Sequence, residues 1–138
     1  MYYPLITHLS ELTVLAPMLT GIVRWKKIDT PMRWLFLYIC FGGVCSGIEL
    51  ILSAMNIPNL LIFHFYTILE FLLVTYIFTL MHTERILSRI LTFELYIYVL
   101  IWIILKLTLE SFDKFDNYSS ALSGALLMVT SLYTLVEV

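Results

Sequence analysis

Five apolar runs, each close to the length that crosses a membrane, divide this chain of 138 residues. A hydrocarbon core about 30 Å thick needs about 20 consecutive apolar residues in a helix. The runs lack the alternation of apolar and polar residues that marks transmembrane β-strands. The sequence therefore predicts an all-α, polytopic transmembrane helical bundle in one domain over residues 1–138. The expected spans are about 4–23, 33–55, 60–81, 90–109 and 118–138.

Composition supports the membrane class. Hydrophobic residues make up 61% of the chain and charged residues 13%, whereas a soluble domain is about half apolar and about a quarter charged. A soluble fold of this size could not hide so much apolar surface. The net charge is −2 and the basic residues are scattered, so no nucleic-acid interface is expected. No nucleotide-binding or nucleophile-elbow motif is present in the sequence, so no cofactor is expected.

Basic residues alternate between the connections and predict the orientation. The first connection is rich in Lys and Arg, the second has none, the third has Arg85 and Arg89, and the fourth has Lys114. Basic loops stay in the cytoplasm. We therefore expect the N-terminus outside and the first and third connections in the cytoplasm. The residues of the first connection that carry this prediction are Arg24, Lys26, Lys27 and Arg33.

Several ionisable residues fall inside the expected spans, mostly in the outer half of the bilayer. A carboxylate at the centre of a span costs about 2.5–3.5 kcal/mol to insert, and such residues usually face the bundle interior and mark a site. We expect a buried, ligand-binding or proton-linked cluster. Its candidate members are His8, Glu11, Glu49, His64, Glu70 and Tyr66.

Within that set, Glu70 lies nearest the midplane and is expected to be the residue most important for activity. His64 lies about 120° from Glu70 around the helix, so the two should meet different neighbours. Tyr66 is expected to hydrogen-bond to an acid on an adjacent helix. The alternative is that each acid is protonated and bonds to a neighbouring helix for purely structural reasons. A metal site stays open, because the ligand types suit zinc but no metal-binding spacing is present.

The second expected span should pack centrally. Gly43 and Gly47 have the small-xxx-small spacing that lets helix backbones approach closely. Cys40 and Cys45 point well over 100° apart on a helix, so both are expected to be packing residues. Lys106 lies near a helix end, where we expect it to snorkel to the membrane surface.

The stretch "FHFYTILEF" resembles a loose family of uncharacterised bacterial multi-spanning membrane proteins. Their third span carries a Tyr-x-x-x-Glu-Phe-like signature, matched by Tyr66, Glu70 and Phe71. The stretch "FDNYSSALSGALLMVTSLYTL" resembles the region that opens their fifth span. The resemblance implies a multi-pass protein of the bacterial cytoplasmic membrane. Members of the family run longer, and the fifth run ends without a polar tail beyond Glu137, so we expect the first part of a longer chain.

Three functions are compatible with these features. The first is a non-enzymatic integral membrane module for sensing or signalling. The second is an oligomeric pore or channel, such as a defence effector that depolarises the membrane. The third is an intramembrane enzyme or transporter, which is the weakest because no catalytic pair is recognisable. The expected partners are the lipid bilayer and other copies of this chain or other membrane subunits.

Overall fold

The computed structural model describes residues 13, 15–82 and 84–137, which form five α-helices and no strand. In chain order these are α2 (Leu15–Arg24), α3 (Thr30–Ala54), α4 (Leu60–Met81), α5 (Arg85–Thr108) and α6 (Tyr118–Glu137). Three of them, α3, α4 and α5, are long and apolar enough to cross a membrane. The all-helical fold and its membrane character are thus as the sequence predicts.

Local sequence signals account for the helix ends. Asp29 caps α3 by accepting a hydrogen bond from the backbone N–H of Met32 at 3.4 Å, and Pro31 follows in the first turn. Proline suits that turn because its fixed φ is helical and its missing N–H is not needed there. Asn56 turns the chain between α3 and α4 with a φ of 55°, the left-handed region that asparagine tolerates well.

The observed helices match the expected spans closely at α4 and α6. Helix α3 starts three residues before the expected residue 33, at the cap described above. Helix α5 begins at Arg85 rather than at residue 90, because the polar residues 85–89 that precede the expected span are also helical. The expected first span, residues 4–23, lies mostly outside the described residues, and α2 covers its end.

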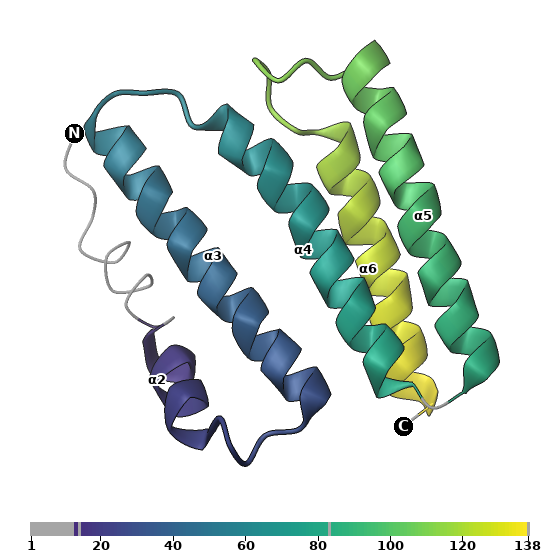
Figure 1. Ribbon diagram of the computed structural model, residues 1–138. Coiled ribbons are helices and arrows are strands. Elements are labelled where there is room, and N and C mark those ends of the chain that lie inside the picture. The colour runs from purple at the N-terminus through teal and green to yellow at the C-terminus, as the bar shows by residue number, and fades with distance from the viewer. Residues whose placement is uncertain (1–12, 14, 83, 138) are drawn as a thin grey trace.

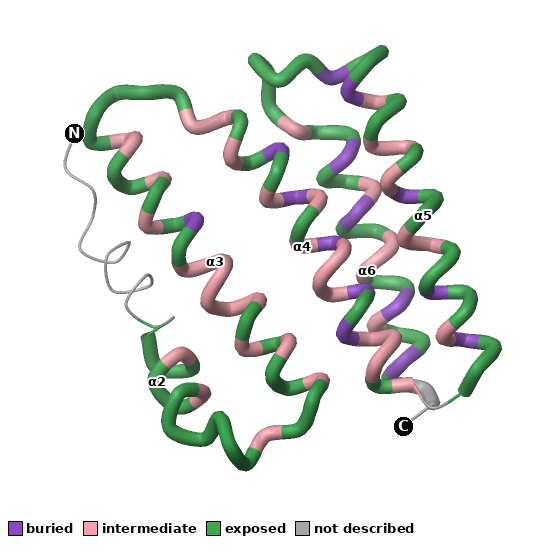
Figure 2. The backbone as a smooth tube through the Cα atoms, in the orientation of Figure 1, coloured by how far each residue is buried: buried purple, intermediate pink, exposed green. Residues whose placement is uncertain are grey.

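Helix α4 is the centre of the bundle. It contacts α3, α5 and α6, while α2 packs on α3 (Figure 1). Its buried side chains include Phe71, whose ring centroid lies 3.9 Å from that of Tyr98 on α5. The prediction that the second span is central is therefore wrong. Helix α3 buries a single described side chain, Cys45 (Figure 2).

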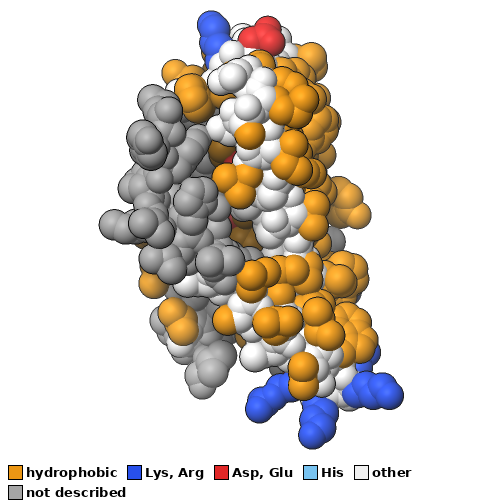
Figure 3. Space-filling view, turned by 90° about the vertical axis from the view of Figure 1, so that its left-hand side faces the viewer, with side chains coloured by type: hydrophobic (Ala, Val, Ile, Leu, Met, Phe, Trp, Pro, Cys, Tyr) orange, Lys and Arg blue, Asp and Glu red, His pale blue; other side chains and the backbone are white. Residues whose placement is uncertain are grey.

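Large apolar side chains cover the outside of the bundle (Figure 3). This surface would be unfavourable in water and suits the hydrocarbon of a bilayer. The Lys and Arg side chains visible in that view gather mainly at one end. The α2–α3 connection, which contains Lys26 and Lys27, and the start of α5, which contains Arg85 and Arg89, lie together at that end (Figure 1).

Candidate functional site

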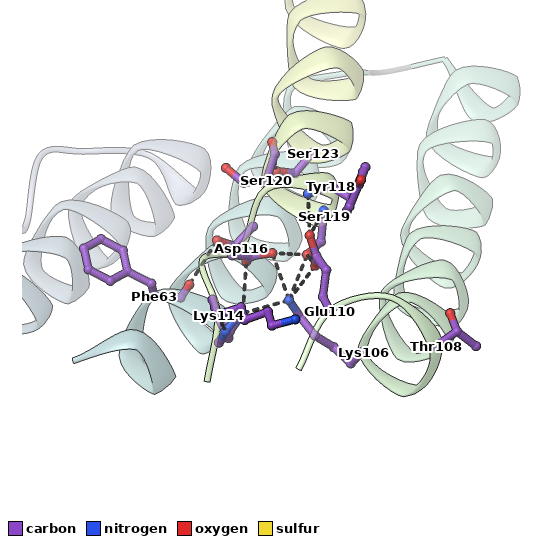
Figure 4. A network of polar contacts seen from close by, with 12 residues as sticks. Phe63, Lys106, Thr108, Glu110, Lys114, Asp116, Tyr118, Ser119, Ser120 and Ser123 are labelled. Atoms are coloured by element: carbon purple, nitrogen blue, oxygen red, sulfur yellow. Dashed lines mark hydrogen bonds and ion pairs between the residues drawn. The ribbon is translucent and has the colours of Figure 1, made fainter. Parts of the chain in front are cut away.

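A group of charged side chains is buried at the opposite end of the bundle, and we call it the lysine cluster. It contains a histidine from the start of α4 and a lysine from the last turn of α5. The connection between α5 and α6 supplies two acids, and the first turn of α6 supplies a serine (Figure 4). Its members are His64, Lys106, Glu110, Asp116 and Ser119.

Lys106 contacts all four other members of the cluster. Its Nζ lies 2.8 Å from Glu110 Oε2, 2.8 Å from Asp116 Oδ1, 3.0 Å from Ser119 Oγ and 2.7 Å from His64 Nδ1. Its side chain is only 3% exposed. The prediction that Lys106 snorkels to the surface is wrong, because partners inside the bundle take the place of water around its ammonium group.

The contacts of His64 fix which ring nitrogen carries its proton. The side chain is fully buried, and Nε2 lies 2.9 Å from the backbone carbonyl oxygen of Lys114. A carbonyl only accepts, so Nε2 must donate. Nδ1 is then free of hydrogen and accepts from the ammonium of Lys106.

Glu110 ties the cluster to the start of α6. Its Oε1 accepts hydrogen bonds from the backbone N–H groups of Tyr118 and Ser119, so its carboxylate caps the helix and meets the positive end of the helix dipole. Burial by itself would raise the pKa of Glu110. Hydrogen bonds from Lys106, Ser119 and the Tyr118 backbone outweigh burial and lower that pKa to about 2.

Asp116 holds the unsatisfied acceptor of the cluster. Its Oδ1 contacts Lys106 and the hydroxyl of Ser119, but its buried Oδ2 has no hydrogen-bond partner and lies 3.7 Å from His64 Nδ1. A buried polar atom without a partner is costly, so Asp116 is the least well satisfied member of the cluster.

Aromatic rings cover the cluster on the apolar side. The ring of Phe112 meets His64 edge-on at 5.4 Å between centroids, and Trp102 lies 5.6 Å from Lys106 Nζ. Phe112 also packs against Trp102 and Phe65. These rings exclude lipid and water, which strengthens the electrostatic interactions inside.

Glu70 belongs to a second, separate set of contacts in the middle of α4. Its Oε1 accepts a hydrogen bond from Tyr38 of α3 at 2.6 Å, and the hydroxyl of Tyr66 lies 3.5 Å away. The ring of Tyr66 stacks on Phe41 of α3 at 5.9 Å. The acid beside Tyr66 is thus on its own helix rather than on the adjacent one, and Tyr38 is the partner across the interface that the sequence analysis missed.

The expected single cluster is split by the structure. His64 and Glu70 meet different neighbours, as their angular separation predicts, while Glu49 lies half-buried on α3. His8 and Glu11 lie outside the described residues. Among those described, no group of three or more His, Cys, Asp or Glu is placed to hold a metal ion.

The close helix contact expected at Gly43 and Gly47 is not found at Gly47. A Cβ built there would have no heavy atom of the described residues within 4 Å. A close contact is found instead at Gly21 of α2, where a Cβ would lie 2.0 Å from the ring of Phe36.

The sequence did contain a signal for the lysine cluster. Lys106 and Glu110 are four residues apart, which places them on one helix face, and the following connection adds two acids. What the sequence could not show is that the connection folds back over α4. No protein-family model, curated protein or solved structure matches this chain, so its function is inferred from its own contacts.

Proposed function

We propose that this chain is a non-enzymatic sensory module of a bacterial cytoplasmic membrane protein, and that the lysine cluster is the site that detects the signal. In this proposal the chain crosses the membrane five times with its N-terminus outside. The basic connections lie in the cytoplasm, so the cluster lies on the outer side. The signal that it receives is acidification of the external medium.

The observation that carries this proposal is the buried ammonium of Lys106, which joins three chain segments through four side chains. The interactions with His64, Glu110 and Asp116 depend on protonation. A proton on His64 Nδ1 would remove the lone pair that accepts from Lys106, and protons on the acids would remove their charge. Acid would therefore release the α5–α6 connection from α4.

Helix α4 offers a route from the cluster to the cytoplasmic end. It spans 22 residues, about 33 Å along its axis, and it contacts three other helices. Just beyond its end, His82 Nε2 bonds to Thr134 Oγ1 of α6 at 3.0 Å. A shift of α4 at the cluster would change this contact at the far end.

A fluorescent label at the cytoplasmic end tests the proposal. The label is placed at Arg85→Cys in a chain carrying Cys40→Ser and Cys45→Ala, reconstituted in liposomes. External acid should change the emission, and Lys106→Met should show the acid-like emission already at neutral pH. Lys114→Met is the control, because the exposed Lys114 contributes only its backbone carbonyl to the cluster. An emission that ignores external pH in all three proteins refutes acid sensing.

A pore is the second candidate, and a specific feature of α3 favours it. Ser46 is exposed, Glu49 is half-buried, and the space beside Gly47 is open. Such a polar face is unfavourable against lipid, and other copies of the chain could cover it around a common axis. Disulfide cross-linking through Ser46→Cys, with Cys40 and Cys45 replaced, together with dye release from liposomes would support the pore. Monomeric protein in sealed liposomes would exclude it.

A further inference from the structure

A cavity between α5 and α6 lies far from the lysine cluster, toward the basic end of the bundle. Its volume is about 270 Å³. Leu87, Ile90 and Leu91 of α5 and Val129 of α6 give it apolar walls. Ligand pockets are mainly apolar with a few polar groups that orient the ligand. This cavity has that character, and its size suits a small ligand.

Glu94 is the acidic group of this cavity. It is half-buried on α5, and the hydroxyl of Thr130 lies 3.5 Å from its Oε2. That distance is at the outer limit of a hydrogen bond. Two further polar contacts lie at the cavity: His82 bonds to Thr134, and the Thr134 hydroxyl donates to the carbonyl of Thr130 at 2.8 Å.

Among the described residues, no Lys or Arg lines the cavity. Arg89 lies on the same helix but is exposed and about 140° away around the axis. Lys106 already bonds within the lysine cluster. Glu94 lies five residues after Arg89, about 7–8 Å along the helix, within the apolar part of α5. An ionisable residue inside a membrane span marks a functional site that needs a partner.

We propose that this cavity binds a small amphiphilic amine, with Glu94 as the counter-ion of its ammonium group. The apolar body of the ligand packs against the leucine and isoleucine walls, and Thr130, whose hydroxyl contacts Glu94, lies beside the ammonium. The ammonium donates to the Glu94 carboxylate, a charge-assisted hydrogen bond that is stronger than a neutral one. An amine that is part of a phospholipid headgroup fits less well, since its phosphate would find no basic residue here.

Binding of octylamine in phosphatidylcholine nanodiscs tests this inference. Octylamine should raise the thermal unfolding midpoint of the parent protein in a saturable manner, and octanol should not. Glu94→Gln should weaken octylamine binding by about 10- to 100-fold, the loss expected for one hydrogen bond to a charged group. Glu84→Gln is the matched control, because Glu84 is an exposed acid just before α5 and its loss should leave binding unchanged.

A second variant separates binding from folding. Ile90→Trp keeps the Glu94 carboxylate but fills the cavity from a position that is 56% exposed, so it should fold and also lose octylamine binding. Equal shifts with octylamine and octanol would show that only the alkyl chain matters and would overturn the proposal. Unchanged octylamine binding in either Glu94→Gln or Ile90→Trp would overturn it as well.

Discussion

At the scale of single residues, Lys106 shows how a membrane protein keeps a charge in its interior. Removing a cation from water costs several kcal/mol, and the cost is recovered only where partners surround it. Lys106 has four partners within 3.0 Å, of which two are acids. The converse also holds, because Glu110 and Asp116 depend on Lys106 for their only ammonium contact among the described residues.

Lys106→Met should therefore be strongly destabilising. It leaves two buried acids without their cation, and loss of one partner from a buried ion pair costs about 3–5 kcal/mol. Thermal unfolding in detergent measures the effect, with Lys114→Met as the control that should change the midpoint little. Similar midpoints for the two variants would mean that the acids are not ionised in the folded protein.

Glu110 gives the cluster a defined pH dependence. Its pKa in the folded protein, about 2, is below the ordinary value of 4.5. Its contribution to the free energy of unfolding is therefore fully present above pH 4.5 and is lost as the pH falls toward 2. The unfolding midpoint of the parent should fall over this range of pH, and the midpoint of Glu110→Gln should fall less. Parallel curves for the two proteins would contradict this origin of the acid sensitivity.

Glu70 and Tyr38 form a second polar pair, in the middle of α4. Their 2.6 Å hydrogen bond joins α3 to α4, and measured couplings between membrane helices are about 0.5–2 kcal/mol. A double-mutant cycle with Tyr38→Phe and Glu70→Leu should give a coupling in this range. Glu70→Gln also tests the role of the acid. If Glu70→Gln keeps signalling and Glu70→Leu loses it, the role of Glu70 is structural. If Glu70→Gln folds but does not signal, the role of Glu70 is proton-linked.

At the scale of helices, the sequence could predict the elements better than their packing. Hydropathy and the Asp29–Pro31 start identify α3 because these are local properties of the chain. Its neighbours could not be predicted, since the hydrophobic residues lie on all sides of α3 and α4 and no face is distinguished. The small residues Gly43 and Gly47 indicated a close contact, yet no described atom lies near Gly47, whereas Gly21 lies close to the ring of Phe36.

Gly21→Ala should separate α2 from α3. The new methyl group would lie within 3.0 Å of three atoms of the Phe36 ring, which also packs edge-on against Trp25 at 5.5 Å. Overpacking of this kind costs about 1–3 kcal/mol. Thermal unfolding should show a lower midpoint for Gly21→Ala, no change for Gly47→Ala, and partial recovery when Phe36→Leu is added to Gly21→Ala. A silent Gly21→Ala would place α2 elsewhere.

At the scale of the whole molecule, the two ends of the bundle differ in charge and in burial. Basic side chains lie exposed at the end with the α2–α3 and α4–α5 connections, while the charges of the lysine cluster are buried at the other end. The exposed basic end follows directly from the positions of Lys and Arg in the sequence. The buried cluster at the other end could not be predicted from the sequence, because only the folded connection brings Glu110 and Asp116 to Lys106.

This asymmetry makes the orientation in the membrane testable in intact cells. Single cysteines at the half-buried Asn59 and the exposed Asp113, both at the end of the lysine cluster, should react with an impermeant maleimide added outside. A cysteine at Lys26 should react only after the cells are opened, because basic connections are retained in the cytoplasm. Cys40 and Cys45 are replaced in all three proteins so that they do not contribute. If Lys26→Cys reacts from outside and Asn59→Cys does not, the lysine cluster faces the cytoplasm, and a sensor of external acid is excluded.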